Sequence, residues 1–234
     1  MASAELPVTG RTRVRRLAER QVVDPSLLDE ILAEALIAHV AAVHEGVPIV
    51  LPFAFARDGD AVLLHGSTGA GVLRACASGQ PISVAITHLD GLVVARSAFD
   101  NSMNYRSAVI IGVPELLSGP AKERALRVIT DHLLPGRTAE VRPSTNKETA
   151  ATLVLRLPLT EVSVKARSAA AIAADDPEDR SVWAGVLPLA RLSFPPLPSS
   201  EVPADVRVPD SVRAASDRLD RAAARVWEAA RLYA

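Results

Sequence analysis

The sequence predicts a mainly β protein of the α+β class, with an antiparallel, closed or nearly closed sheet, peripheral helices and a C-terminal helical extension. At least seven short apolar runs alternate with turn signals such as Glu45-Gly46 and Asp58-Gly59. Most connections between these runs are too short for crossover helices, so neighbouring strands are expected to pair antiparallel. Helical periodicity is limited to a few separate segments, one of which is the tail.

The expected elements follow from apolar spacing and from start and stop signals. Asp24-Pro25 supplies an N-cap and a proline at the first helical position, which predicts a helix over residues 25–36. An Asp-Gly pair within residues 88–91 predicts a tight turn between two strands. In chain order we expect strands at 37–43, 48–56 and 61–64, a short helix at 69–78, strands at 82–87, 92–97 and 107–113, a helix opened by Pro120 and ended by Leu134-Pro135-Gly136, and a last strand pair at 151–157 and 161–166 around Pro158.

Four regions are expected along the chain. Residues 1–20 form an N-terminal arm that carries five arginines and few large apolar groups, and we expect it to lie solvated on a surface. Residues 21–193 form the main domain, residues 194–209 a proline-rich linker and residues 210–234 a C-terminal helix. Apolar residues at three- and four-residue steps give this helix an apolar stripe, which needs a partner surface on the same subunit or on a second copy.

Composition and charge exclude several classes of protein. The 234 residues are 49% hydrophobic and 23% charged, and the net charge of -1 lacks the positive field of a dedicated nucleic-acid binder. Cys76 is the single cysteine, which excludes an intramolecular disulfide and a thiolate zinc site. His88 and Asp90 lack a third ligand nearby, so we expect no metal site. Without an apolar span or a signal peptide, we expect a cytoplasmic protein with no membrane partner.

One candidate binding region is the small-residue stretch 66–71, which lies between an expected strand and an expected helix. Its glycines and hydroxyl groups can leave backbone N–H groups facing a phosphate, although an ordinary strand-to-helix turn has the same composition. His65 directly precedes the stretch, either as a ligand-site residue or as a packing residue. Sequence motifs of the common hydrolases, P-loop proteins, dinucleotide-binding proteins and zinc proteases are absent.

Basic and aromatic residues mark a second candidate region. Arg106 lies between Tyr105 and Ser107, where it can pair bidentately with a phosphate or be a surface arginine. Lys165 and Arg167 alternate on an expected strand and so project to the same side, either into an anionic cleft or onto a solvated edge. The residues alone leave these alternatives open.

Several motifs, taken together and in order, are similar to those of a known family. The chain resembles the pyridoxamine 5'-phosphate oxidase-like flavin-nucleotide-binding proteins over about residues 11–190. The proline-rich linker and the tail helix lie outside this resemblance. The motifs are PIVLPF at 48–53, LHGS at 64–67, THLDGLVVARS at 87–97, SMNYRS at 102–107, LPGR at 134–137, KAR at 165–167 and VWAGVLPL at 182–189.

The resemblance implies an FMN-binding split β-barrel that forms a homodimer, with two flavins at the subunit interface. One strand would offer main-chain groups to the isoalloxazine, and a loop and helix start would approach the ribityl phosphate. Other residues would line the pocket or close it, from the same chain or from the partner. The cofactor-binding residues implied in this way are Phe53, Ala54 and Phe55 at the ring, His65, Gly66, Ser67 and Thr68 at the phosphate arm, Tyr105, Arg106 and Ser107 along the pocket, and Lys165 and Trp183 at its closure.

One departure from the family pattern bears on cofactor affinity. Relatives usually have Ser-Arg at the helix start, where this chain has Ala70-Gly71. An arginine–phosphate contact contributes about 1.5–3 kcal/mol, so its loss is expected to weaken FMN binding roughly ten- to a hundredfold. Arg74 or the N-terminal arginines are candidates to replace it.

The resemblance therefore favours an FMN-dependent oxidoreductase that acts on a small electron-accepting or electron-donating substrate, with FAD as a variant of the cofactor. No side chain is assigned as catalytic. One alternative is a non-catalytic binding protein for haem or a deazaflavin in the same interface cleft, with His65 as an axial-ligand candidate. Another is a structural dimer whose flavin site has decayed.

Overall fold

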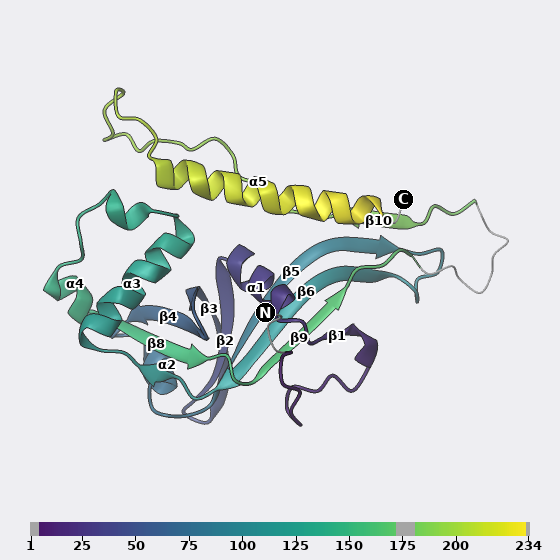
Figure 1. Ribbon diagram of the computed structural model, residues 1–234, viewed down its shortest axis with the longest axis horizontal. Coiled ribbons are helices and arrows are strands. Elements are labelled where there is room, and N and C mark those ends of the chain that lie inside the picture. Colours follow the sequence, from purple (N-terminus) through teal and green to yellow (C-terminus); the bar gives the residue numbers. More distant parts are fainter. Residues whose placement is uncertain (1–4, 172–180, 233–234) are drawn as a thin grey trace.

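The computed structural model describes residues 5–171 and 181–232. Within them, ten strands form one antiparallel sheet in the order β1-β9-β6-β5-β2-β3-β4-β8-β7, and β10 pairs with β5 (Figure 1). The strands are β1 (Gln21–Val22), β2 (Ile37–His44), β3 (Val47–Asp58), β4 (Ala61–Ser67), β5 (Ile82–Val94), β6 (Ser102–Gly112), β7 (Glu115–Leu116), β8 (Thr152–Pro158), β9 (Val162–Arg167) and β10 (Gly185–Pro188). The helices are η1 (Ala18–Arg20), α1 (Pro25–Glu34), α2 (Gly71–Cys76), α3 (Gly119–Leu133), η2 (Arg137–Ala139), α4 (Asn146–Ala150) and α5 (Asp210–Arg231).

Strands β2, β3 and β4 form the predicted antiparallel meander. Glu45 and Gly46 connect β2 to β3 with φ angles of 52° and 77°, the left-handed conformation that a two-residue hairpin turn requires. Gly59, with φ of 59°, turns the chain from β3 into β4. The turn signals in this part of the sequence therefore predicted the topology correctly.

The predicted turn at residues 88–91 is wrong, because β5 continues through it as a single strand. The pairing with β6 shifts between Leu89 and Gly91, so the Asp-Gly pair forms an irregularity within the strand. A Cβ on Gly91 would lie 3.0 Å from the carbonyl oxygen of Leu187 in β10. The absence of a side chain at Gly91 thus allows β10 to approach β5 closely, and the chain does not reverse its direction there.

The predicted pairing of the last two strands is also wrong. β8 pairs with β4 and β7, whereas β9 pairs with β6 and β1, so the chain crosses between two parts of the sheet at Pro158. Short spacing between two strands favours a hairpin, but it does not require one. The crossing closes the meander and the β5–β6 pair around one core.

The inner face of the sheet encloses the larger apolar core. Leu28, Ile31 and Leu32 of α1 pack into it and are at most 2% exposed. Asp24 caps α1 as predicted, because its carboxylate accepts a hydrogen bond from the Ser26 backbone N–H at 2.9 Å. A smaller core lies between α3 and the outer side of β3, β4 and β8. Helix α1 therefore packs against the larger core inside the barrel, and α3 covers the outer side of β3, β4 and β8.

Helix α5 packs on its own subunit, which was one of the two alternatives for the apolar stripe. The backbone N–H and Oγ of Ser211 donate to the Glu140 carboxylate at 3.0 and 2.5 Å. Arg218 donates to backbone carbonyls at the end of α3, and Arg225 pairs with Glu34 of α1. The end of the predicted helix, residues 233–234, lies outside the described residues. None of the described helices is long and apolar enough to cross a membrane.

The N-terminal segment is mostly exposed within residues 5–20, and it contacts strand β9 beside β1. Thr12 is buried, and its carbonyl oxygen accepts a hydrogen bond from the Ser163 hydroxyl at 2.8 Å. Arg11 forms an ion pair with Glu161. The arm therefore covers the part of β9 next to the two residues that pair with β1, where unpaired strand groups would otherwise face solvent.

Candidate functional site

The two faces of the sheet separate the predicted site residues. Directly paired residues of antiparallel strands share a face, and successive residues along a strand alternate between faces. The inner face carries core residues such as Val40, Val84 and Ala108. The outer face, as the register defines it, carries Ile37, His39, Ala41, Val43, Val50, Pro52, Ala54, Ala85, Leu89, Tyr105, Ser107 and Lys165.

Among the three predicted ring-binding residues of β3, only Ala54 presents its side chain on the outer face. Phe55 is fully buried in the core, and its ring centroid lies 5.4 Å from that of His132. Phe53 packs against the same core. Of these three side chains, only that of Ala54 is therefore placed to contact a ligand on the outer face.

His65 lies near the end of β4, paired with Val154 of β8. Its Nδ1 is buried and has no hydrogen-bond partner within the described parts of the chain. Burial lowers the pKa of His65, so the ring is neutral at neutral pH. A neutral imidazole with an unused nitrogen is suited to bind iron or to hydrogen-bond a ligand.

The loop after His65 is largely closed by its own hydrogen bonds. The Thr68 N–H donates to the Ala151 carbonyl at 3.0 Å, and the Gly69 N–H donates to the Ser67 hydroxyl at 3.1 Å. The Ala70 N–H donates to the Ser67 carbonyl at 3.0 Å. These three amides are therefore not free for a phosphate, and the hydrogen bonding is that of an ordinary strand-to-helix turn.

Gly71, where relatives usually have arginine, lies against a histidine. A Cβ at this position would lie 3.2 Å from Nε2 of His44, at the end of β2. A side chain at residue 71 would therefore require the His44 ring to shift by a few tenths of an ångström. The departure from the family pattern is matched to its surroundings in this chain.

A second group of predicted residues lies on the outer face of β6 and β9. Ser107 is directly opposite Lys165, and its hydroxyl donates to the Lys165 carbonyl at 3.1 Å. Tyr105 is two residues away on the same face. Trp183 is 65% exposed and lies beside β10, at the opposite end of the molecule from α2 (Figure 1). Trp183 is thus remote from the His65 end of the same chain.

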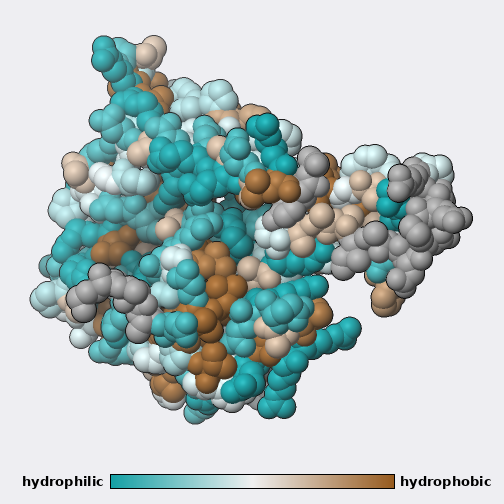
Figure 2. Space-filling model, turned by 45° about the vertical axis from the view of Figure 1, so that its right-hand side comes forward, coloured by the Kyte–Doolittle hydropathy of each residue, from teal (hydrophilic) through white to brown (hydrophobic). Residues whose placement is uncertain are grey.

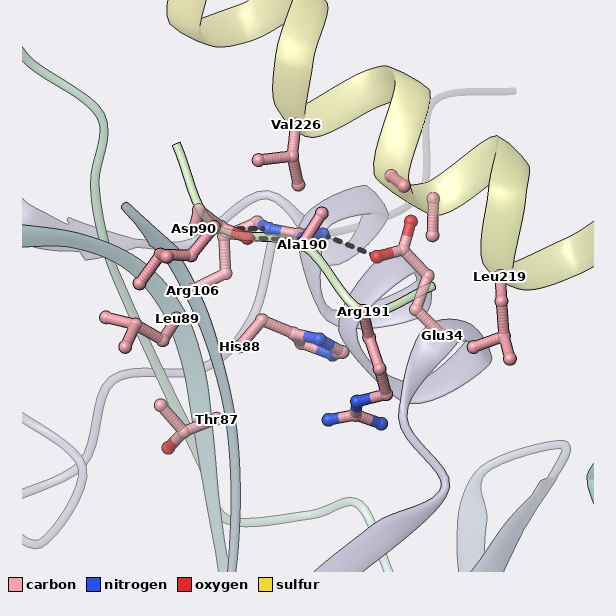
Figure 3. A pocket seen from close by; sticks show the side chains of 13 residues that line it. Glu34, Thr87, His88, Leu89, Asp90, Arg106, Ala190, Arg191, Leu219 and Val226 are labelled. Carbon is pink, nitrogen blue, oxygen red and sulfur yellow. Dashed lines mark hydrogen bonds and ion pairs between the residues drawn. The ribbon is translucent and has the colours of Figure 1, made fainter. Parts of the chain in front are cut away.

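Arg106 lies on the inner face, away from Tyr105 and Ser107, because successive strand residues alternate. Its guanidinium donates two hydrogen bonds of 2.9 Å to the Asp90 carboxylate and one of 3.0 Å to Glu34 (Figure 3), and it also pairs with Glu30. Burial opposes the charge of Arg106, but Asp90 and Glu34 outweigh this effect and raise its pKa. Arg106 is therefore a structural cation whose hydrogen-bonding capacity is engaged by carboxylates.

Glu34 connects the barrel to α5. Its side chain is only 6% exposed, and it accepts hydrogen bonds from Arg106 at 3.0 Å and from Nε of Arg225 at 3.1 Å. Burial tends to raise the pKa of Glu34, but the hydrogen bond from Arg225 and the charge of Arg106 outweigh it, and the pKa is lowered. Glu34 is therefore ionised at neutral pH and binds α5 to the barrel.

A protein-family comparison decides the family. The model described as pyridoxamine 5'-phosphate oxidase matches residues 24–166. The chain belongs to this family. A search of curated proteins gave no match.

Two solved structures are similar to this pyridoxamine 5'-phosphate oxidase family chain over nearly their whole length. The FAD and heme binding protein from Mycobacterium smegmatis is 42% identical with a TM-score of 0.81, and the match covers 84% of this chain and 97% of that one. The flavocytochrome Anf3 from Azotobacter vinelandii is 35% identical with a TM-score of 0.83, covering 90% of this chain and 98% of that one. The predicted split-barrel fold is confirmed by these similarities.

A third structure shares the fold alone. This is a putative 5-nitroimidazole antibiotic resistance protein from Bacteroides thetaiotaomicron, which is 20% identical with a TM-score of 0.52 and covers 62% of this chain and 85% of that one. The two more similar structures cover enough of this family member to include part of the segment after residue 166, which the family model leaves out. The similarity to those two proteins therefore continues beyond residue 166, where the family match ends.

The sequence-based prediction missed the acidic partners of Arg106. Asp90 was interpreted as a turn residue, because an Asp-Gly pair more often reverses the chain than interrupts a strand. Glu34 and Arg225 are 191 residues apart, so no local spacing could connect them. A usable signal was the period-two relation of His88 and Asp90, which places both side chains on one face if the strand continues.

Proposed function

We propose that this chain is a redox protein that binds a flavin, FAD, together with haem. The observation that carries the proposal is the 42% identity with a protein from Mycobacterium smegmatis described as binding FAD and heme, over 97% of that protein's length. The similarity to a flavocytochrome supports it. These relatives favour the haem alternative over an FMN oxidoreductase without haem, and they favour FAD over FMN.

His65 is the histidine best suited to bind the haem iron. Its buried Nδ1 has no partner in the described chain, and its lowered pKa keeps the ring in the neutral, ligating form. His88 and His132 already use Nε2 in hydrogen bonds to the backbone carbonyls of Ile31 and Ala35, at 3.1 and 2.7 Å. Among these three histidines, His65 is therefore the one that we propose as the axial ligand.

The outer face supplies groups that fit a flavin nucleotide. Ala54 contributes a small side chain, and the side chains of Tyr105 and Ser107, which carry hydroxyl groups, lie on the same face. Lys165 forms no ion pair with any described residue, which leaves its ammonium group available to a phosphate. A bound flavin can exchange electrons in pairs or singly, whereas haem iron exchanges single electrons, so a protein that holds both could connect two-electron and one-electron partners.

A second copy of the chain is the proposed partner on the outer face. Ile37, Val43 and Val50 are 52%, 60% and 59% exposed there, which is unusual for a sheet face of a monomer. Strand β4, which carries His65, and strand β10, beside which Trp183 lies, are at opposite ends of one chain, so a pocket that uses both residues needs two subunits (Figure 1). A homodimer would cover the apolar side chains and complete the cofactor pocket. The substrate class is a small molecule that gives or accepts electrons, with the cofactors performing the chemistry.

Titration of the purified protein with haemin and with FAD or FMN, followed by visible absorption, tests the proposal. The wild type is expected to bind one haem per chain with a shifted Soret band, and to bind FAD more tightly than FMN. His65→Ala should lose the Soret shift and keep FAD. His88→Ala is the matched control, because its ring is already hydrogen-bonded to α1, and it should keep both. Absence of a Soret band in the wild type would refute haem binding, and retention of the band in His65→Ala would refute the assigned ligand.

A further inference from the structure

A cavity of about 350 Å³ lies between the barrel and α5, on the inner face of the sheet. Figure 2 shows the surface hollowed below the hydrophilic upper part, where α5 lies in Figure 1. The volume is in the range of small-molecule binding sites. The cavity is lined by Thr87, His88, Leu89 and Asp90 of β5, Arg106 of β6, Glu34 of α1, Leu189, Ala190 and Arg191 after β10, and Leu219, Ala222, Ala223 and Val226 of α5.

The cavity is held open by long charged side chains. Ala222 and Ala223 of α5 face it with the smallest side chains that a helix normally uses, which would allow close packing on the barrel. Instead, Arg218 and Arg225 hold the helix at α3 and at Glu34, one on each side of the alanines in the sequence. The space that these contacts leave between α5 and the barrel has room for a small ligand.

Two polar groups of the cavity wall are available to a ligand. Arg191 forms no hydrogen bond or ion pair with any described residue. His88 donates from Nε2 to the Ile31 carbonyl at 3.1 Å in its neutral form, which leaves Nδ1 as a hydrogen-bond acceptor. Arg106 and Glu34 are instead occupied by each other and by their other partners (Figure 3). The available charge on the wall is therefore positive, and the opposite wall, on α5, is apolar.

We propose that this cavity binds a small aromatic carboxylate. Its carboxylate would pair with Arg191, its ring would lie against Ala222 and Ala223, and a ring hydroxyl would donate to His88. Arg191 and α5 belong to the extension beyond the residues that match the family model, whereas the proposed flavin residues lie on the outer face of the sheet. His88 and Asp90 point into the cavity, whereas the side chains of Thr87 and Leu89 point to the other face of β5, so the two proposed sites lie on opposite sides of this strand (Figure 3).

Calorimetric titration of the protein with 3-hydroxybenzoate and with its uncharged amide, 3-hydroxybenzamide, tests this proposal. The carboxylate is expected to bind at least tenfold more tightly than the amide, because a charge-assisted pair with arginine is lost in the amide. Arg191→Gln should weaken carboxylate binding about tenfold and leave amide binding unchanged. Arg207→Gln, in the exposed linker, is the matched control and should have no effect.

Filling the cavity provides an independent test. Ala222→Leu places a larger side chain into the cavity and should abolish binding of both probes. Ala224→Leu places the same side chain at an exposed position of α5 and should leave binding unchanged. No binding of the carboxylate at millimolar concentration, or equal affinity in wild type, Arg191→Gln and Ala222→Leu, would overturn the proposal. None of these outcomes depends on the binding of haem or flavin.

Discussion

At the scale of single residues, alternation along β6 decides which side chains can meet a cofactor. Tyr105 and Ser107 lie on the outer face, and Arg106 between them lies on the inner face. A motif that seemed to gather an aromatic ring, a guanidinium and a hydroxyl in one pocket instead serves two sides of a sheet. Asp90 and Glu34 then give Arg106 a structural role at the base of α5.

Arg106→Ala is expected to destabilise the protein by about 3 kcal/mol, because it leaves the buried carboxylate of Glu34 and the half-buried carboxylate of Asp90 without their shared counter-ion. Urea unfolding at pH 7 measures the loss. Arg207→Ala, at an exposed linker position, should change stability by less than about 0.5 kcal/mol. A loss below about 1 kcal/mol in Arg106→Ala would contradict the role assigned to this arginine.

The ionisation of Glu34 is expected to make the stability of the folded protein depend on pH. Its pKa is lowered in the folded state, so its contribution to stability is fully present above the unfolded pKa of about 4.3 and is lost as the pH falls through the folded value. Glu34→Gln should therefore be less stable than the wild type at pH 7, and this difference should shrink below about pH 4. Unfolding free energies measured from pH 3 to pH 7 check it, and a constant difference would show that Glu34 is not the titrating group.

At the scale of elements, signals within a few consecutive residues correctly predicted the helices and turns that those residues form. The cap at Asp24, the turn at Glu45-Gly46 and the periodicity of the tail were sufficient to place α1, the meander and α5. The errors at Gly91 and Pro158 concern strands whose partners lie elsewhere in the chain. Strand pairing of that kind depends on tertiary packing, and no spacing within a single sequence reports it.

Gly91 tests the continuity of β5. Gly91→Ala is expected to push β10 away from β5, because the new Cβ would lie 3.0 Å from the Leu187 carbonyl and 3.1 Å from a methyl group of Val186. We expect a destabilisation of about 1–3 kcal/mol and faster hydrogen exchange at the β10 amides. Gly79→Ala changes a glycine with nothing within 4 Å of a Cβ but with a φ of 82°, so it should strain its own turn and leave β10 exchange unchanged. Equal exchange in wild type and Gly91→Ala would contradict the close approach.

At the scale of the whole molecule, the outer face is expected to be a subunit interface. Val50→Glu places a charge in the middle of this face and should shift the protein from dimer to monomer in light scattering, since an unpaired charge is costly to bury. Val206→Glu changes a valine of similar exposure, 57% against 59%, in the linker and should remain dimeric. A wild type that is monomeric at micromolar concentration would contradict the prediction.

Whether a site residue could be predicted from the sequence depends on how far apart in the chain the residues of its site lie. Ala54, His65, Ser107 and Lys165 could be selected from motifs, since each motif lies within a few consecutive residues. The link between Glu34 and Arg225, and the cavity beneath α5, arise from packing of the extension on the barrel. Such contacts join parts of the chain that only the folded molecule brings together.

The most direct test of the proposed redox role is the cofactor content of the protein isolated from cells supplied with a haem precursor. The proposal predicts a Soret band together with flavin absorption, and equal amounts of haem and FAD per chain after extraction. A protein isolated without haem, carrying FMN or no cofactor, would contradict it.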